Sequence, residues 1–204
     1  MNEPPALSEL EHDLLSELFN LGVGKAASSL SEMVNQEVIL SVPIVEFRNR
    51  AGLVQKLGTN QTICSVSQNM EGPFSGKSML LLPAASGFKV VRSMLGQSFS
   101  DEMLTELQPD ALSEIGNIIL NAFIGAMSDA TSGEFQLSLP EFDLCNPNEI
   151  LQSTTALDDV VLLVRISMKL SESDVIGYLA FTLNDISLQE LRTTLEEMFK
   201  KMSV

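Results

Sequence analysis

Four residues at fixed spacing near the start of the chain carry side chains that can do surface chemistry: Asp13, Glu17, Asn20 and Pro43. The same residue types return 97 positions later as Asp110, Glu114, Asn117 and Pro140. Carboxylates attract cationic groups, and a carboxamide both donates and accepts hydrogen bonds. None of these residues is suited to an apolar core, so their recurrence predicts a role at the protein surface.

The offset of 97 also aligns residues outside this pattern and predicts an internal duplication. Five further residues recur as identical types at this offset: Glu37, Leu40, Ser41, Asn49 and Gln55 match Glu134, Leu137, Ser138, Asn146 and Gln152. Residues 74–83 resemble residues 175–184 at an offset of 101. We expect a single domain over residues 1–204, built from one repeat over about 8–97 and a second over about 105–203 around a pseudo-two-fold axis.

The predicted fold class is α/β, more specifically α+β. Each repeat is expected to supply a long helix, strands that include a β-hairpin, and a shorter helix. Ser8 and Glu11 form the sequence signature of a capping box, which predicts the start of the first helix. The helices are expected at about 8–34, 84–95 and 105–130 and from 188 onward. The strands are expected at about 37–42, extending to 47, and at 62–68, 74–82, 134–139, 160–170 and 176–183.

The predicted long helices explain why the spacing is suited to a surface. Successive helical residues turn by about 100°, so Asp13, Glu17 and Asn20 share one narrow stripe. The apolar residues beside them are expected to face the core: Leu14, Leu18, Leu21 and Gly22 in the first helix, and Ala111, Leu112, Ile115, Ile118 and Ile119 in the second. Asparagine is unfavourable in a helix interior, so its presence in both stripes indicates a purpose other than helix stability.

Composition excludes several classes of function. A chain of 204 residues can bury one sizeable core. Its net charge of −15 argues against nucleic acid or an anionic membrane as a partner. We expect no signal peptide and no membrane insertion, because no apolar run reaches the roughly 18 residues of a span. Two cysteines give no disulfide framework and favour a cytoplasmic location.

The repeated signature, Asp-x3-Glu-x2-Asn-x22-Pro, resembles that of the CheC-type chemotaxis phosphatases, the family of CheC, CheX and FliY. Chain length, duplication and the order of segments are similar to CheC. The sequence of Glu114–Ile119 is close to the one typical of the family. The first copy keeps Gly22 and Gly24 but departs from the typical sequence at Phe19 and Lys25, which leaves the relative efficiency of the two copies open.

The resemblance implies hydrolysis of the phospho-aspartate of a CheY-type response regulator. Asn20 and Asn117 would hold the attacking water in line, and positioning is most of the catalysis in such a reaction. Glu17 and Glu114 would contact a lysine of the regulator. The protein would need no cofactor or metal of its own, since the regulator supplies Mg²⁺.

The remaining members of the signature are expected to support the site. Asp13 and Asp110 lie one turn before each glutamate and could orient its surroundings. Pro43 and Pro140 are expected to shape a strand edge, because proline offers no donor to a substrate.

Other functions stay open. The resemblance also covers non-enzymatic adaptors that bind the receptor deamidase CheD, and flagellar switch components. An unrelated small-molecule enzyme is the third class, but the sequence offers no catalytic constellation for it. His12 has no counterpart in the second copy and is interpreted as a helix-surface residue, while Cys64 and Cys145 are interpreted as core residues. A duplicated chain already forms a pseudo-dimer, so we expect a monomer.

Overall fold

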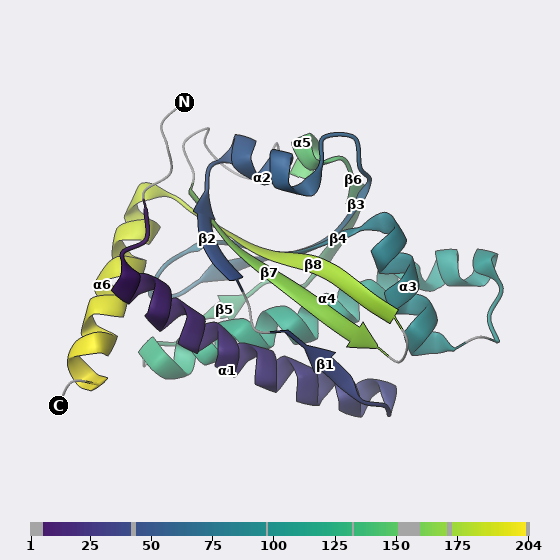
Figure 1. The fold of residues 1–204 in the computed structure, drawn as a ribbon, viewed down its shortest axis with the longest axis horizontal. Helices are drawn as coiled ribbons and strands as arrows, with labels where there is room; N and C mark the ends of the chain where they lie inside the picture. Colours follow the sequence, from purple (N-terminus) through teal and green to yellow (C-terminus); the bar gives the residue numbers. More distant parts are fainter. Residues whose placement is uncertain are drawn as a thin grey trace.

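The fold is one antiparallel sheet with helices on both faces (Figure 1). The computed structural model describes residues 6–41, 44–96, 98–131, 133–150, 160–170 and 173–202. Six strands follow the order β1-β7-β8-β4-β3-β5, while β2 also pairs with β7 and β6 with β3. The strands are β1 Val38–Leu40, β2 Ile44–Arg48, β3 Ile63–Glu71, β4 Gly76–Pro83, β5 Gln136–Leu137, β6 Glu141–Cys145, β7 Val160–Leu170 and β8 Ser173–Leu183.

The helices form two unequal layers. They are α1 Glu9–Val34, α2 Arg50–Leu57, α3 Ala84–Leu95, α4 Asp101–Thr131, α5 Pro147–Ile150 and α6 Asp185–Met202. The long helices α1 and α4, with α3 and α6, cover one face of the sheet, and the short helices α2 and α5 cover the other (Figure 1). The mixed helix and sheet class is therefore confirmed, and the antiparallel pairing of every strand makes it α+β.

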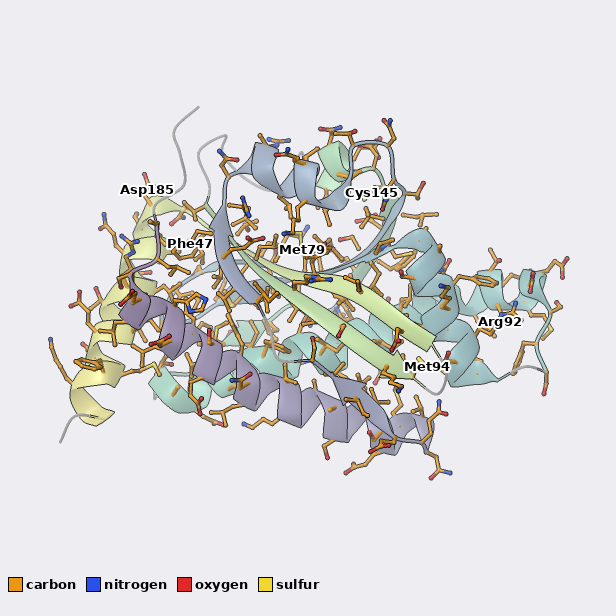
Figure 2. All side chains as sticks on the ribbon, viewed as in Figure 1. Phe47, Met79, Arg92, Met94, Cys145 and Asp185 are labelled. Atoms are coloured by element: carbon orange, nitrogen blue, oxygen red, sulfur yellow. The ribbon has the colours of Figure 1, made fainter. Side chains whose placement is uncertain are left out.

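Alternation along the strands builds a separate core on each face. Leu80 and Leu82 of β4 belong to the large cluster beneath α1 and α4. Met79 and Leu81 of the same strand belong to the smaller cluster beneath α2 and α5 (Figure 2). Successive side chains of a strand point to opposite faces, so a run that is apolar throughout fits a sheet covered on both sides.

The predicted long elements are confirmed, with boundaries that differ by up to four residues. Ser8 caps α1 through the capping box that its spacing from Glu11 indicated. Helix α4 begins at Asp101 rather than near Thr105, because the amide of Leu104 already donates to the carbonyl of Ser100. Three short elements were not predicted, namely α2, α5 and β6. Short helices and edge strands carry too little periodicity to be recognised in sequence.

Two serines 97 positions apart make matching backbone and side-chain hydrogen bonds. The amide of Ser41 donates to the carbonyl of Ser167, and the amide of Ser138 donates to that of Asn69. The hydroxyls of the two serines accept from the amides of the same partners. Because Ser41 and Ser138 are 97 positions apart, these bonds assign Asn69 and Ser167 to corresponding places in β3 and β7. The division into repeats and their common origin stay predictions.

Helix α4 is long and apolar enough, by length and composition, to cross a membrane, and no other helix in the described ranges is. Half of its most apolar window is buried inside the fold. Burial of this kind is typical of the central helix of a globular core, so the length of α4 is weak evidence for a span.

Candidate functional site

The two predicted stripes lie on α1 and α4 with their carboxylates in solvent. Asp13 and Glu17 are exposed, and Asn20 is half-buried. On α4, the residues at the same spacing behave alike, with Asp110 and Glu114 exposed and Asn117 half-buried. Each helix therefore presents a carboxylate in water, one turn before a carboxamide that is partly enclosed.

One residue assigned to the core side of α1 was placed wrongly. Leu14, Leu18 and Gly22 are buried as predicted, but Leu21 is 53% exposed. Leu21 directly follows Asn20 in the helix, and a turn of about 100° leaves it short of the core face. This leaves an apolar side chain in solvent beside the first asparagine.

Helices α1 and α4 pack against each other through aromatic and small residues. The rings of Phe19 and Phe123 are 5.5 Å apart between centroids, and Phe19 also stacks on Phe181 at 5.9 Å. A Cβ added at Gly22 would lie 3.0 Å from the Cα of Phe123, so the helix backbones approach closely there. Close packing accounts for Gly22 without any phosphate-binding role.

A groove of about 550 Å³ runs between these two helices beside Asn117. Its lining consists of Lys25, Ser28 and Ser29 from α1 and Asn117, Ile118, Asn121 and Ala122 from α4. Asn20 does not line this groove. The ammonium of Lys25 lies 2.5 Å from the carboxylate of Asp129, which ties α1 to α4. Lys25 and Asn117 thus line the same groove from opposite helices.

Asn117 is held by two neighbours: Asn121, which continues the predicted stripe of α4, and Gln68, which the sequence did not single out. Its Oδ1 accepts a hydrogen bond from Nε2 of Gln68 at 3.2 Å and another from Nδ2 of Asn121 at 2.7 Å. Gln68 lies in β3 and is only 2% exposed. Neither neighbour has a like residue 97 positions away, so the repeat carried no signal for them.

Gly116 brings α4 close enough to β3 for this network to form. A Cβ at this position would lie 2.5 Å from Cγ1 of Val66, which is shorter than a van der Waals contact. Val66 is two residues before Gln68 on the same strand. The glycine just before Asn117 therefore sets the distance between the carboxamide and its partner on the sheet.

The supporting residues of the signature make fewer contacts than Asn117 does. Pro140 is half-buried and immediately precedes β6, while Pro43 lies outside the described residues. His12 lies 3.7 Å from the carboxylate of Asp13, and both side chains are largely exposed. Within the described ranges, no three His, Cys, Asp or Glu side chains are grouped as metal ligands.

Neither cysteine is arranged as a nucleophile. Burial, and to a smaller degree the neighbouring Cys145, raises the pKa of the Cys64 thiol to about 11. Burial also raises the pKa of Cys145, which lies on the side of the sheet that carries α2 and α5 (Figure 2). Since the thiolate is the reactive form, both thiols are weak nucleophiles at neutral pH. Both are free, and their interpretation as packing residues agrees with this burial.

Two family models match the chain. One describes the chemotaxis phosphatase CheX and matches residues 63–161, and the other describes the CheC-like family and matches residues 10–46. The chain is 28% identical over 142 residues to the CheY-P phosphatase CheC of Bacillus subtilis, an alignment that covers 68% of each chain. The CheC-like model covers α1 from residue 10 onward and so includes its stripe.

Solved structures share the fold. The FliY structure from Thermotoga maritima superposes with a TM-score of 0.75 at 18% identity, covering 94% of this chain and 98% of that one. The CheX–CheY–BeF3–Mg²⁺ complex from Borrelia burgdorferi contains a chain that superposes with a TM-score of 0.53 at 19% identity, covering 82% and 98% of the two chains. The resemblance that the repeated signature indicated is therefore confirmed by sequence and by fold.

Proposed function

Since this chain is a relative of the CheC, CheX and FliY proteins, we propose that it accelerates hydrolysis of the phospho-aspartate of a CheY-type response regulator. The relative from Bacillus subtilis carries the name CheY-P phosphatase, and a structure with the same fold is a complex of CheX with CheY, BeF3 and Mg²⁺. The magnesium ion would belong to the regulator. The observation that carries the proposal is the oriented carboxamide of Asn117, one turn after the exposed Glu114.

Asn117 would act as a hydrogen-bond donor. Its Oδ1 already accepts two bonds, so only its NH2 group is available to a ligand. That group can hold the attacking water through one lone pair, leaving the other to face phosphorus. Phosphoryl transfer passes through a loose transition state that depends more on alignment than on a strong base, so a carboxamide suffices. Asn20 would do the same on α1.

Glu17 and Glu114 would align the regulator. Each is exposed and lies three residues before an asparagine on the same helix face. An exposed carboxylate that meets a lysine of the regulator gives a charge-assisted contact, which fixes the relative orientation of the two surfaces. Asp13 and Asp110, one turn further back, would support this contact.

A phosphate-release assay tests the proposal. Purified CheY-type regulator is phosphorylated in excess Mg²⁺, and the loss of phosphate is followed with and without the protein. Accelerated release supports a phosphatase. Binding of the regulator without acceleration would contradict it and leave an adaptor of the kind that docks CheD or a flagellar switch component. The monomeric state and the cytoplasmic location stay predictions, which sedimentation and cell fractionation check.

Replacing both glutamates is expected to weaken binding of the regulator rather than slow the chemical step. For Glu17→Ala with Glu114→Ala we expect KM to rise a few-fold and kcat to change little, since an exposed ion pair contributes about 0.2–1 kcal/mol. The effect should shrink as salt rises, because such contacts are screened over about 10 Å at 0.1 M.

A matched control removes the same charge from the same two helices. Glu32 and Glu102 are exposed on α1 and α4 and lie about 80–100° around each helix from the aspartate of its stripe. The double variant Glu32→Ala with Glu102→Ala should leave KM within error of the unmodified protein. An equal rise of KM in the control pair would assign the effect to net charge and contradict a specific contact.

A further inference from the structure

The carboxamide of Asn117 has one orientation only. Nε2 of Gln68 donates to the carbonyl of Ser138 at 2.9 Å as well as to Asn117. Nδ2 of Asn121 likewise donates to the backbone carbonyl of Asn117 at 2.7 Å. A backbone carbonyl only accepts, so both neighbours must present NH2 groups to Asn117. Turning the Asn117 amide over would set NH2 against two NH2 groups, so its own NH2 points away from them.

Helix α1 lacks every part of this arrangement. The bonds of Ser41 and Ser138 place Ser167 of β7 at the position that Asn69 has in β3. The residue corresponding to Gln68 is therefore Ile166, whose side chain has no hydrogen-bond donor. Gly24 stands 97 positions before Asn121, and Phe19 stands 97 positions before Gly116. The bulky Phe19 occupies the place where α4 has a glycine pressed against the sheet.

Asn20 shows the consequence. Its Oδ1 is buried, and no hydrogen-bond partner reaches it within the part of the chain that the structure describes. Its counterpart Oδ1 in Asn117 has two partners. A buried carbonyl oxygen without a donor is unfavourable, and among the described residues no donor fixes the Asn20 oxygen as Gln68 and Asn121 fix that of Asn117.

We propose that Gln68 and Asn121 are positioning residues that fix the NH2 group of Asn117 toward the substrate, and that the site on α4 is therefore the faster of the two. The inference of a faster site rests on the proposed phosphatase function. The inference of a fixed carboxamide does not. Pre-orientation raises the rate because the transition state then needs no further ordering of the donor. The departure at Phe19 agrees with a slower first site, whereas the ammonium of Lys25 is paired with Asp129 of α4.

The fixed orientation is measured by ¹⁵N relaxation of side-chain NH2 groups, independently of any activity. Asn20→Ala and Asn117→Ala assign the two resonance pairs by their disappearance. We expect the NH2 of Asn117 to be more ordered than that of Asn20, and Asn121→Ala to lower its order. Equal order in the unmodified protein, or no change in Asn121→Ala, would overturn the positioning role.

Kinetics then test the consequence in single-site backgrounds. With the α1 site removed by Asn20→Ala, we expect Asn121→Ala to lower kcat roughly tenfold while KM changes little, since misalignment acts on the chemical step. Gln68→Leu should act in the same direction and provides a second variant. Unchanged kcat in a variant whose Asn117 NH2 has become mobile would overturn the link between orientation and rate.

The converse variant should gain activity, which a merely unstable protein cannot do. A side chain at Gly24 meets no heavy atom within 4 Å of its Cβ, so asparagine fits there. With the α4 site removed by Asn117→Ala, we expect Gly24→Asn to raise kcat of the α1 site several-fold. Gly24→Ala adds the Cβ without the carboxamide and should not reproduce the gain. If the unmodified protein releases no phosphate at all, the proposed function fails, while the NMR result still decides the positioning role.

Discussion

Replacing both asparagines, Asn20→Ala with Asn117→Ala, is expected to reduce stimulated dephosphorylation to near the intrinsic rate of the regulator. Loss of a group that positions the attacking water costs on the order of 10²-fold or more. Both side chains are half-buried on helix surfaces rather than in the core, and alanine is the better helix former, so the fold should persist. Phosphate release under single-turnover conditions gives the rate, and circular dichroism checks the fold.

The single variants divide this loss between the two sites. Rates of independent sites add, so Asn20→Ala and Asn117→Ala should each retain part of the activity, with the larger loss in Asn117→Ala. Asn60 and Asn148 are exposed and lie away from α1 and α4, so Asn60→Ala with Asn148→Ala is a matched control that should keep the full rate. Retention of the full rate by a folded double variant of Asn20 and Asn117 would contradict the mechanism.

The long elements could be predicted because each carried several agreeing local signals. Helix α1 has its capping box at Ser8, and α3 and β7 were predicted with the bounds that they have in the structure. The signature also predicted which asparagines and carboxylates share a helix face, because that relation depends only on the helical period. Equivalent bonds at Ser41 and Ser138 agree with the offset of 97.

The contact between Gln68 and Asn117 could not be predicted, because it joins segments far apart in the chain. Gln68 comes to α4 from a strand 49 positions away, and the groove brings Lys25 beside Asn121. The signature was recognised because its residues recur at an offset of 97. A residue that does not recur at this offset cannot be recognised in that way. In sequence, Gln68 is one polar residue among several in β3. Only the packing of α4 on the sheet shows that it is buried and in contact with Asn117.

The packing at Gly116 leads to a stability prediction whose sign differs between two glycines of one helix. A Cβ at Gly125 meets nothing within 4 Å, so Gly125→Ala is expected to stabilise the protein by roughly 0.5–1 kcal/mol through helix propensity. A Cβ at Gly116 would lie 2.5 Å from Val66, a stiff β-branched side chain that is 1% exposed. Overpacking of this kind typically costs about 1–3 kcal/mol, so Gly116→Ala should destabilise despite the better propensity.

Urea denaturation of these variants measures both effects, and a third substitution identifies the cause. Val66→Gly removes the Cβ and the two methyl groups that the new Cβ would meet. In that background Gly116→Ala should become neutral or stabilising. The double-mutant cycle then gives a favourable coupling free energy that offsets the destabilisation by Gly116→Ala alone. The kcat of the α4 site should fall in Gly116→Ala and stay unchanged in Gly125→Ala, because a helix pushed off β3 also separates Asn117 from Gln68. A Gly116→Ala variant as stable as Gly125→Ala would show that α4 does not depend on this close approach. The orientation of Asn117 would then need another explanation.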